Sequence, residues 1–560
     1  MFVDSILRTL DDFGIFMIRL RRLYARLHER SVLLVVGILM VLLLSVLIRV
    51  SPYIFNDFQF EIGYDTGVYE RVLDYYEHSG TWGSLPAYPD FPSSYSAQTK
   101  WLEPGFFVVT SAANSIIGAD VHWLFRFYVP SLAGISLVLV SFVAGRGLTH
   151  RYSGGLFAAS LVAVSYVQVW AVDESYYRQI FASVLLVLSL VYLDRYIAAK
   201  EKRYLFASTL LASGTVAFHI GVSLLAGLVL AFVLLYFLIT KERRYARHVG
   251  FSIAGFAALS MPSWVPRLGD ISSTFITALM ESSWRVSTLF NGQGWLQGGG
   301  SIPGIFWSFP HILIGYVIVF CPVVILSVVG YFALSKKKEL HYSIPVLSLI
   351  LWVYVGIWLF FGNRFLLNLD LLLCIIAPVG LFFLFKSVSN ERKRQLGILL
   401  VASVVFGANL TIVSLSQEQN TPYITDNPEG VLWIENNILV NDSVIFAPDY
   451  LSSNLIQMGY TTAAWDYSLY GAGSKPVMIS DGFLFKAPVN DSFLREFFSD
   501  NPSYSQKGIY VMWGLEALER PLAYGTEKIP VQDYSASRFF ELEYVGYGDI
   551  LSIYKYIGPR

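Results

Sequence analysis

The sequence predicts an α-helical polytopic membrane protein with a small α/β domain at its C-terminal end. The chain of 560 residues is 55% hydrophobic and 14% charged, with a mean hydropathy of +0.53, whereas soluble proteins carry about 25% charged residues. The charge is also uneven. Residues 415–560 hold 9 Lys and Arg against 18 Asp and Glu, and the remainder holds 31 against 23. We therefore expect a membrane domain with basic edges, over residues 31–415, followed by an acidic, water-facing domain over residues 416–560.

Membrane spans are predicted from apolar stretches, because a bilayer crossing takes about 20 apolar residues. This length predicts about 11 transmembrane helices, of which the two at 203–218 and 249–265 are the shortest or most polar. The other predicted spans are residues 32–50, 126–146, 153–172, 179–198, 221–240, 310–334, 342–361, 365–385 and 396–415.

Basic clusters set the predicted orientation, because Lys and Arg stay on the cytoplasmic side of a membrane. If the N-terminus is cytoplasmic, every basic cluster lies on a connector between spans that is also cytoplasmic. The clusters are at residues 1–30, 146–151, 200–203, 241–247, 336–338 and 386–394. Residues 1–30 are expected to be a cytoplasmic segment with an amphipathic helix on the membrane surface, and not a cleavable signal peptide. An odd number of spans then places residues 416–560 outside the cytoplasm of a multi-pass cell-membrane protein.

Residues 51–125 form one long external loop in this topology. Within it, the apolar stretch 104–118 is too short to cross the bilayer and contains Thr110, Ser111 and Asn114, so we expect an interfacial or re-entrant helix there. Residues 66–79 have apolar side chains at helical spacing, which predicts a second helix in the same loop.

Acidic residues collect on the predicted external face. Asp65 comes just before the helix predicted at 66–79, where a helix N-cap is the alternative interpretation. Asp173 and Glu174 lie between two spans, and ionisable groups at membrane depth are costly and usually functional. We take these three residues as candidate catalytic groups, since a carboxylate can act as the general base toward an acceptor.

Two arginines on the same face suit a phosphate. Arg178 follows the acidic pair and Arg364 begins a late span; a guanidinium makes bidentate, charge-assisted hydrogen bonds to phosphate, although interfacial snorkelling is the alternative for both. His219, at the outer end of a span, is a further substrate-binding candidate, with a structural role as its alternative. A divalent cation such as Mg²⁺ or Mn²⁺, held by Asp65 and Asp173, could also stabilise a departing phosphate. This chemistry fits transfer of a sugar from a lipid-phosphate carrier.

At these residues the chain resembles the GT-C superfamily of polytopic glycosyltransferases, which use polyprenyl-phosphate-linked sugars. The resembling segments are Gly63–Tyr69 with its acidic residue, the Pro-containing helix around Trp101–Phe107, Arg126–Gly134 at the start of a span, Asp173 with Glu174, and Arg364. The resemblance implies an enzyme that moves a sugar from a polyprenyl-phosphate donor to a protein, glycan or lipid acceptor outside the cytoplasm, as protein O-mannosyltransferases and lipid-A aminoarabinose transferases do.

Oligosaccharyltransferase catalytic subunits are the alternative within that superfamily. They carry a Trp-Trp-Asp-Tyr-Gly motif in the external domain, and this chain has three of those five residues in Ala464–Ser468. Trp465 and Asp466 are therefore candidate acceptor-binding residues, and the resemblance would imply transfer of a lipid-linked oligosaccharide to Asn. The first Trp and the Gly of the motif are missing here.

Two further classes remain as alternatives: a flippase for lipid-linked glycans, and a non-catalytic scaffold. Transporters often show internal repeats around a midplane site, whereas this chain shows no repeat and has its polar cluster at one face. No nucleic-acid partner is expected. In the C-terminal domain we expect strands at 444–447, 476–479 and 509–513, a hairpin at 539–556, and helices at 426–436, 450–458 and 491–499.

Overall fold

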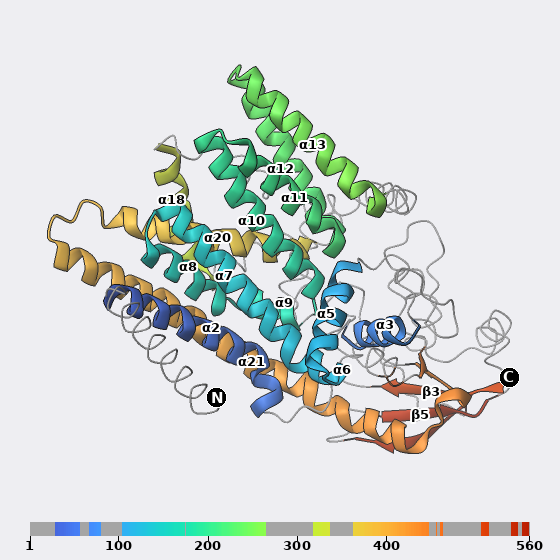
Figure 1. Cartoon of the computed structure of the whole chain (residues 1–560). Helices are drawn as coiled ribbons and strands as arrows, with labels where there is room; N and C mark the ends of the chain where they lie inside the picture. The colour runs from blue at the N-terminus through green and yellow to red at the C-terminus, as the bar shows by residue number, and fades with distance from the viewer. Residues whose placement is uncertain are drawn as a thin grey trace, which may run out of the picture.

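A bundle of helices, joined by one long helix to a small β-sheet, makes up the part of the chain that the structure describes (Figure 1). The computed structural model describes residues 29–55, 66–79, 104–173, 175–264, 319–336, 362–446, 460–462, 506–513, 539–546 and 552–558, with a few single positions between them. The mostly helical membrane fold with a small sheet, predicted from hydropathy and charge, is confirmed.

In the described ranges, 6 helices are long and apolar enough to cross a membrane. They are α2 (Glu29–Phe55), the continuous run of α6 (Val121–Trp123), the π-helical turn η1 (Leu124–Tyr128) and α7 (Val129–Thr149), then α10 (Tyr177–Ala199), α12 (Ile220–Ile239), α20 (Gly362–Leu384) and α21 (Glu391–Asn437). Packed with them are α8 (Tyr152–Ala163), α9 (Tyr166–Asp173), α11 (Lys202–Phe218), α13 (Arg243–Trp264) and α18 (Cys321–Lys336). Each predicted span thus coincides at least in part with a helix, except 342–361, which lies outside the described residues.

The span predicted at 153–172 is not one helix. It is broken at Val164 and Ser165 into α8 and α9, whose axes differ by 45°. The break leaves carbonyl groups without helical partners inside the bundle, where water cannot satisfy them. Arg49 of α2 satisfies one of them, since its Nη1 donates to the carbonyl of Ala163 at 3.2 Å.

The other side of the break is held by α20. The hydroxyl of Ser165 donates to Oδ2 of Asp370 at 2.8 Å, and the Nε2 of Gln168 donates to the same oxygen at 2.8 Å and to the carbonyl of Leu367 at 2.9 Å. Asp370 is buried. A bent span is tolerated in a membrane when neighbouring helices satisfy its polar groups, so these contacts stabilise the broken helix.

Close packing of α18 on α20 depends on glycine. A Cβ added to Gly330 would lie 2.8 Å from the carbonyl oxygen of Ile376 and 2.9 Å from the backbone nitrogen of Gly380, and a contact this short forces the two helices apart.

We expect Gly330→Ala to lower the free energy of unfolding by about 1–3 kcal/mol, the usual cost of overpacking. Thermal unfolding of the purified protein in detergent measures the change. The matched control is Gly407→Ala in α21, where an added Cβ meets nothing within 4 Å; there we expect a gain of about 0.5–1 kcal/mol, because Ala favours a helix over Gly. Equal midpoints for Gly330→Ala and the wild type would contradict this packing.

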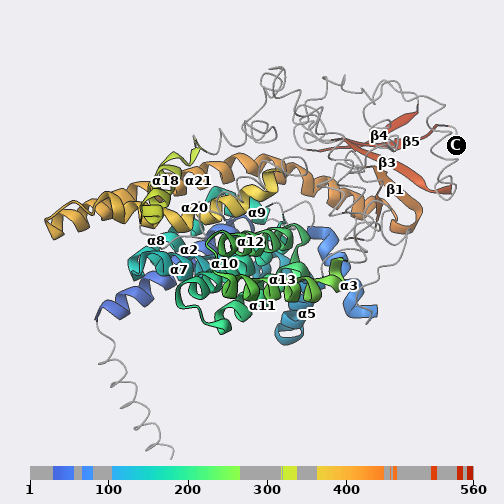
Figure 2. The same ribbon diagram turned by 90° about the horizontal axis from the view of Figure 1, so that it is seen from above.

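The helix α21 connects the membrane bundle to the C-terminal sheet. It contains 47 residues and is therefore about 70 Å long, and it runs along the bundle and beyond it to the sheet (Figure 2). A separate helix starting near Asp426 was expected; instead, those residues continue α21, with Pro428 in its interior. The helix also contains Pro422, and it continues although each proline removes a backbone hydrogen-bond donor.

The sheet has the strand order β2-β1-β3-β5-β4. Its strands are β1 (Ser443–Phe446), β2 (Thr461–Thr462), β3 (Gly508–Trp513), β4 (Phe540–Val545) and β5 (Ser552–Tyr556). β1 pairs in parallel with β2 and β3, while β5 pairs antiparallel with β3 and β4. Strands were predicted at β1, β3 and the β4–β5 hairpin, and these are confirmed. The predicted strand 476–479 and helices 450–458 and 491–499 fall outside the described residues, apart from single positions.

The end of α21 packs on this sheet. Val431 and Ile434 of the helix are fully buried in one cluster with Ile445, Met512 and Ile553 of the strands. Since each such side chain contributes about 1.5–3 kcal/mol when it leaves water, the cluster ties the sheet to the last turns of α21.

Candidate active site at one end of the bundle

Two segments that are far apart in the sequence meet where α9 ends and α10 begins, which we call the site end of the bundle. Thr66, the first residue of α3 (Thr66–Ser79), lies with its hydroxyl oxygen 2.6 Å from that of Ser175. Arg178 donates from Nε to the hydroxyl of Tyr69 at 3.1 Å, and its guanidinium carbon lies 5.2 Å from the centre of the Tyr69 ring. The segment that begins α3 and the acidic turn between α9 and α10 are therefore joined by two side-chain contacts.

The helix α3 is held by an aromatic wall. Its buried face is formed by Tyr69, Val72, Leu73 and Tyr76. The sequence predicted an apolar stripe of Val68, Val72, Leu73 and Tyr76, of which the last three are confirmed and the side chain of Val68 lies outside the described ones. The Tyr69 ring lies edge-on to Phe106 and Phe107 of α5, at centroid distances of 5.5 and 5.8 Å. Edge-to-face pairs add about 0.5–1.5 kcal/mol beyond burial, so α3 is fixed as a rigid element.

The short helix predicted in the same loop is confirmed as α5 (Pro104–Ile117). Phe106 stacks on Tyr177 at the start of α10, with ring centroids 6.1 Å apart and planes 8° from parallel. At its first turn, a Cβ on Gly105 would lie 2.7 Å from the carbonyl oxygen of Ala217. Only a glycine permits this approach of α5 to the end of α11, next to His219.

Asp173 ends α9 and is half-buried. Its carboxylate interacts electrostatically with the guanidinium of Arg49, which is 1% exposed and also donates to the Ser45 hydroxyl at 2.7 Å. A buried cation thus faces a candidate catalytic acid. Ser175, two residues on, has a φ of 61°, a left-handed conformation that costs a non-glycine residue about 1–2 kcal/mol. Such strain clusters at functional sites, and the Thr66 contact holds the residue there.

A polar seam links α10 to α20 just below the site. Gln179 donates from Nε2 to Oδ1 of Asn368 at 3.0 Å, and Asn368 donates from Nδ2 to the Ser183 hydroxyl at 2.8 Å. Arg364 lies in the first turn of α20, four residues before Asn368, so the two positions share one helix face and lie about 6 Å apart. Because Gln179 contacts Asn368, the backbone of Arg364 lies near the start of α10, where Arg178 is found.

Glu70 is a further buried acid of α3. It is 2% exposed, and its Oε2 lies 3.5 Å from Nδ1 of His122. This pair fastens α3 to the helix that carries η1 and α7.

Of the remaining predicted site residues, the structure describes the side chain of His219 but not those of the others. His219 caps α12, where its Nδ1 accepts from the backbone nitrogen of Val222 at 3.3 Å; this is the structural role weighed from the sequence, and a substrate contact stays a prediction. Asp65, Glu174, Trp465 and Asp466 lie outside the described residues, as does the side chain of Arg364. Among the described residues, no three His, Cys, Asp or Glu side chains form a group that could hold a metal.

Arg49 and Asp370 were missed from the sequence, although a signal was available. Both are single charges inside predicted spans, and a buried ionisable residue in a span is by default a functional or structural site. Thr66 and Ser175 carry no such signal, because a hydroxyl in a loop is common and only the folded chain brings the two together.

No protein-family model matches the chain, and no curated protein matches its sequence. Several solved structures share its fold. The archaeal oligosaccharyltransferase AglB from Archaeoglobus fulgidus, in complex with an inhibitory peptide and a dolichol-phosphate, matches with a TM-score of 0.57 at 13% identity, over 88% of this chain and 71% of that one. ArnT from Cupriavidus metallidurans, bound to undecaprenyl phosphate, matches with a TM-score of 0.51 at 13% identity, over 95% of this chain and 99% of that one.

The chain therefore has the fold of polytopic GT-C membrane glycosyltransferases. The predicted resemblance to that superfamily is confirmed at the level of the fold, and the chain is a multi-pass membrane protein.

Proposed function

We propose that this protein is a membrane glycosyltransferase that moves a sugar from a polyprenyl-phosphate-linked donor to an acceptor outside the cytoplasm. The observation that carries the proposal is the 2.6 Å contact between Thr66 and Ser175. Each of these residues directly follows a candidate acid, Asp65 in one case and Glu174 in the other, so the contact joins the two acidic segments at one end of the bundle. The similarity to structures that hold dolichol-phosphate and undecaprenyl phosphate supports a lipid-phosphate donor.

In the proposed reaction Asp65 accepts the proton of the acceptor group as that group attacks the anomeric carbon of the sugar. A bond forms between the acceptor and the anomeric carbon, while the bond from that carbon to the phosphate oxygen breaks. The leaving phosphate stays on its polyprenyl chain. Arg178 and Arg364 stabilise its developing charge, as guanidinium groups do for departing phosphates. Tyr69 positions Arg178 for this role through the 3.1 Å hydrogen bond.

The divalent cation expected from the sequence fits the described residues poorly. Asp173 already interacts electrostatically with the positive charge of Arg49, and that charge opposes the binding of a cation. No step is therefore routed through a metal. Its involvement stays a proposal, which loss of transfer in EDTA and recovery with Mg²⁺ or Mn²⁺ would support.

A donor panel tests the proposal. The purified protein in lipid vesicles is supplied with labelled polyprenyl-phosphate sugars and a lipid-linked oligosaccharide, each with candidate protein, glycan and lipid acceptors, and empty vesicles serve as the control. We expect label to move from one donor class to an acceptor. Transfer of a whole oligosaccharide to Asn would select the oligosaccharyltransferase alternative. Labelled lipid that crosses the bilayer while no donor is consumed would contradict the proposal and favour a flippase.

The contact between the two segments has its own test. We expect Thr66→Val to lower the rate of transfer by up to about tenfold, because it removes one hydrogen bond worth about 0.5–1.5 kcal/mol and loosens the position of Asp65. Thr66→Ser keeps the hydroxyl and should retain activity. The kcat and KM of the three proteins are measured separately. A lower kcat at constant KM would show a loss of positioning, whereas a higher KM would show weaker donor binding. If Thr66→Val and Thr66→Ser act alike, the hydroxyl contact does not position the site.

A further inference from the structure

The end of the bundle opposite to the site end carries a cationic hollow. It has a volume of about 370 Å³ and is lined by Lys202, Arg244, Arg247, His248 and Phe251. These residues come from the first turn of α11 and the first three turns of α13. Since α10 runs from the site end to Lys200, the hollow lies a full helix length away from Asp173, on the face predicted to be cytoplasmic.

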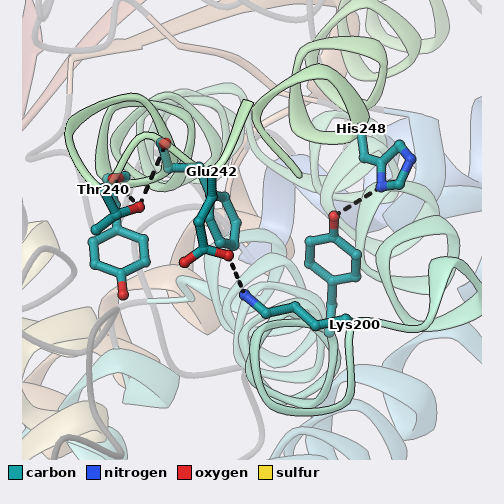
Figure 3. Close-up of polar contacts among 7 residues, drawn as sticks. Lys200, Thr240, Glu242 and His248 are labelled. Carbon is teal, nitrogen blue, oxygen red and sulfur yellow. Dashed lines mark hydrogen bonds and ion pairs between the residues drawn. The ribbon is translucent and has the colours of Figure 1, made fainter. Parts of the chain in front are cut away.

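Residues next to the hollow are paired with one another, and two of these contacts are drawn in Figure 3. Lys200 donates to Oε2 of Glu242 at 3.2 Å, and the hydroxyl of Tyr196 lies 3.2 Å from Nδ1 of His248. Arg203 pairs with Glu201 at 2.6 Å. Glu201 and Glu242 are thus paired with cations outside the hollow, and in the described part of the chain Lys202, Arg244 and Arg247 have no ion-pair partner.

The position of these cations is electrostatically unfavourable in the protein alone. Lys202 and Arg244 lie in the first turns of their helices, where the helix dipole is positive and a cation costs about 0.3–1 kcal/mol. Arg247 follows Arg244 by three residues and adds a third positive charge. Their charges also act on His248, because burial, Lys202 and Arg244 all lower the pKa of its imidazole. The preference of Lys and Arg for the cytoplasmic side explains why basic residues lie at a membrane edge. It does not explain why three of them line the same hollow. An anion in the hollow would offset both the repulsion and the dipole.

Apolar side chains continue from the hollow along the same two helices. Phe251 and Leu259 on α13, eight residues apart, are 76% and 55% exposed, and Phe206 and Leu210 on α11, four residues apart, are 71% and 54% exposed. Residues at these spacings lie on one helix face. A ligand that fits this arrangement has an anionic head for the hollow and hydrocarbon chains for the faces of α11 and α13.

We propose that the hollow formed by Lys202, Arg244, Arg247 and His248 binds the headgroup of an anionic phospholipid whose acyl chains lie along α11 and α13. Free phosphate has the same charged group as a lipid headgroup, but it has no acyl chains to cover the exposed apolar faces of α11 and α13. We therefore propose a phospholipid as the ligand. The site is separate from the proposed donor site at the other end of the bundle.

Lipid retention tests the proposal. Wild type and Lys202→Gln/Arg244→Gln are purified in a neutral detergent, exposed to phosphatidylglycerol or phosphatidylcholine, and analysed by native mass spectrometry. Arg392→Gln/Lys393→Gln is the matched control, because it removes two exposed cations from the same face but outside the hollow. We expect the wild type and the control to retain phosphatidylglycerol over phosphatidylcholine. The hollow variant should bind phosphatidylglycerol about 30-fold more weakly, since each Lys or Arg near an anionic surface contributes about a factor of five.

Equal retention of phosphatidylglycerol by all three proteins would overturn the proposal. Competition by inorganic phosphate at the concentration of the lipid would also overturn it, because it would show a site for a free anion. If the double variant does not fold, Arg247→Gln replaces it, since that side chain is exposed and its removal leaves the helix packing intact. A thermal midpoint measured without lipid checks the folding of each variant.

Discussion

Replacing Asp65 by Asn is expected to lower the rate of sugar transfer by about 10²–10⁴-fold, the usual contribution of a general base. The amide cannot accept the proton of the acceptor group, although it has nearly the same size as the carboxylate. Transfer of label from the donor identified by the panel measures the effect in vesicles that hold equal amounts of each protein. Donor binding should change little, because the arginines proposed to hold the phosphate are untouched.

The control for this variant is Glu77→Gln in α3, the helix that follows Asp65 in the sequence. Glu77 is exposed near the far end of α3 and contacts Asn114 through weak hydrogen bonds of 3.3–3.4 Å, so its loss should leave transfer near the wild-type rate. Thermal midpoints of both variants should match the wild type. Wild-type turnover by Asp65→Asn would remove this residue from the mechanism.

Replacing Arg49 by Met is expected to lower the free energy of unfolding by about 3–5 kcal/mol, as breaking a buried charged contact does. Three groups lose their partner at once: the carbonyl of Ala163 at the helix break, the Ser45 hydroxyl and the charge of Asp173. We also expect transfer to fall, because α9 carries Asp173 and is positioned by the break. The thermal midpoint in detergent and the transfer rate in vesicles are the two readouts.

Arg146→Gln is the matched control for Arg49→Met. Arg146 is exposed and bonds mainly to Tyr152, so its loss should cost less than about 1 kcal/mol. A second variant, Arg49→Met with Asp173→Leu, removes the uncompensated carboxylate as well. It should recover part of the stability without recovering transfer. Equal stability of Arg49→Met and the wild type would show that other groups hold the broken span.

Elements with local signals could be predicted from the sequence. The helix over residues 66–79, the short helix beginning at Pro104 and the β4–β5 hairpin all follow from side-chain periodicity and turn residues close by in the chain. The break at Val164 and Ser165 could not be predicted in this way. Hydropathy reports the transfer of each side chain into lipid, and the residues that contact the break, Arg49 and Asp370, are distant from it in the sequence.

The candidate site was predicted in part for a similar reason. Charges such as Asp173 and Arg178 stand out in an apolar chain, because their burial is costly. The residues that join the two segments, Thr66 with Ser175 and Tyr69 with Arg178, are ordinary in composition, and their role exists only in the folded chain. From the sequence, the cations of the hollow indicated only which side of the membrane these connectors lie on. The sequence does not show that Lys202 and Arg244 come close together in the folded chain.

The most direct test of the proposed site is a structure of the protein determined with a polyprenyl phosphate in a lipid environment. We predict that the phosphate lies at the site end, within hydrogen-bonding distance of Arg178 or Arg364 and beside the first turn of α3. A polyprenyl phosphate bound instead among Lys202, Arg244 and Arg247, with none at the site end, would contradict the account of how this protein holds its donor.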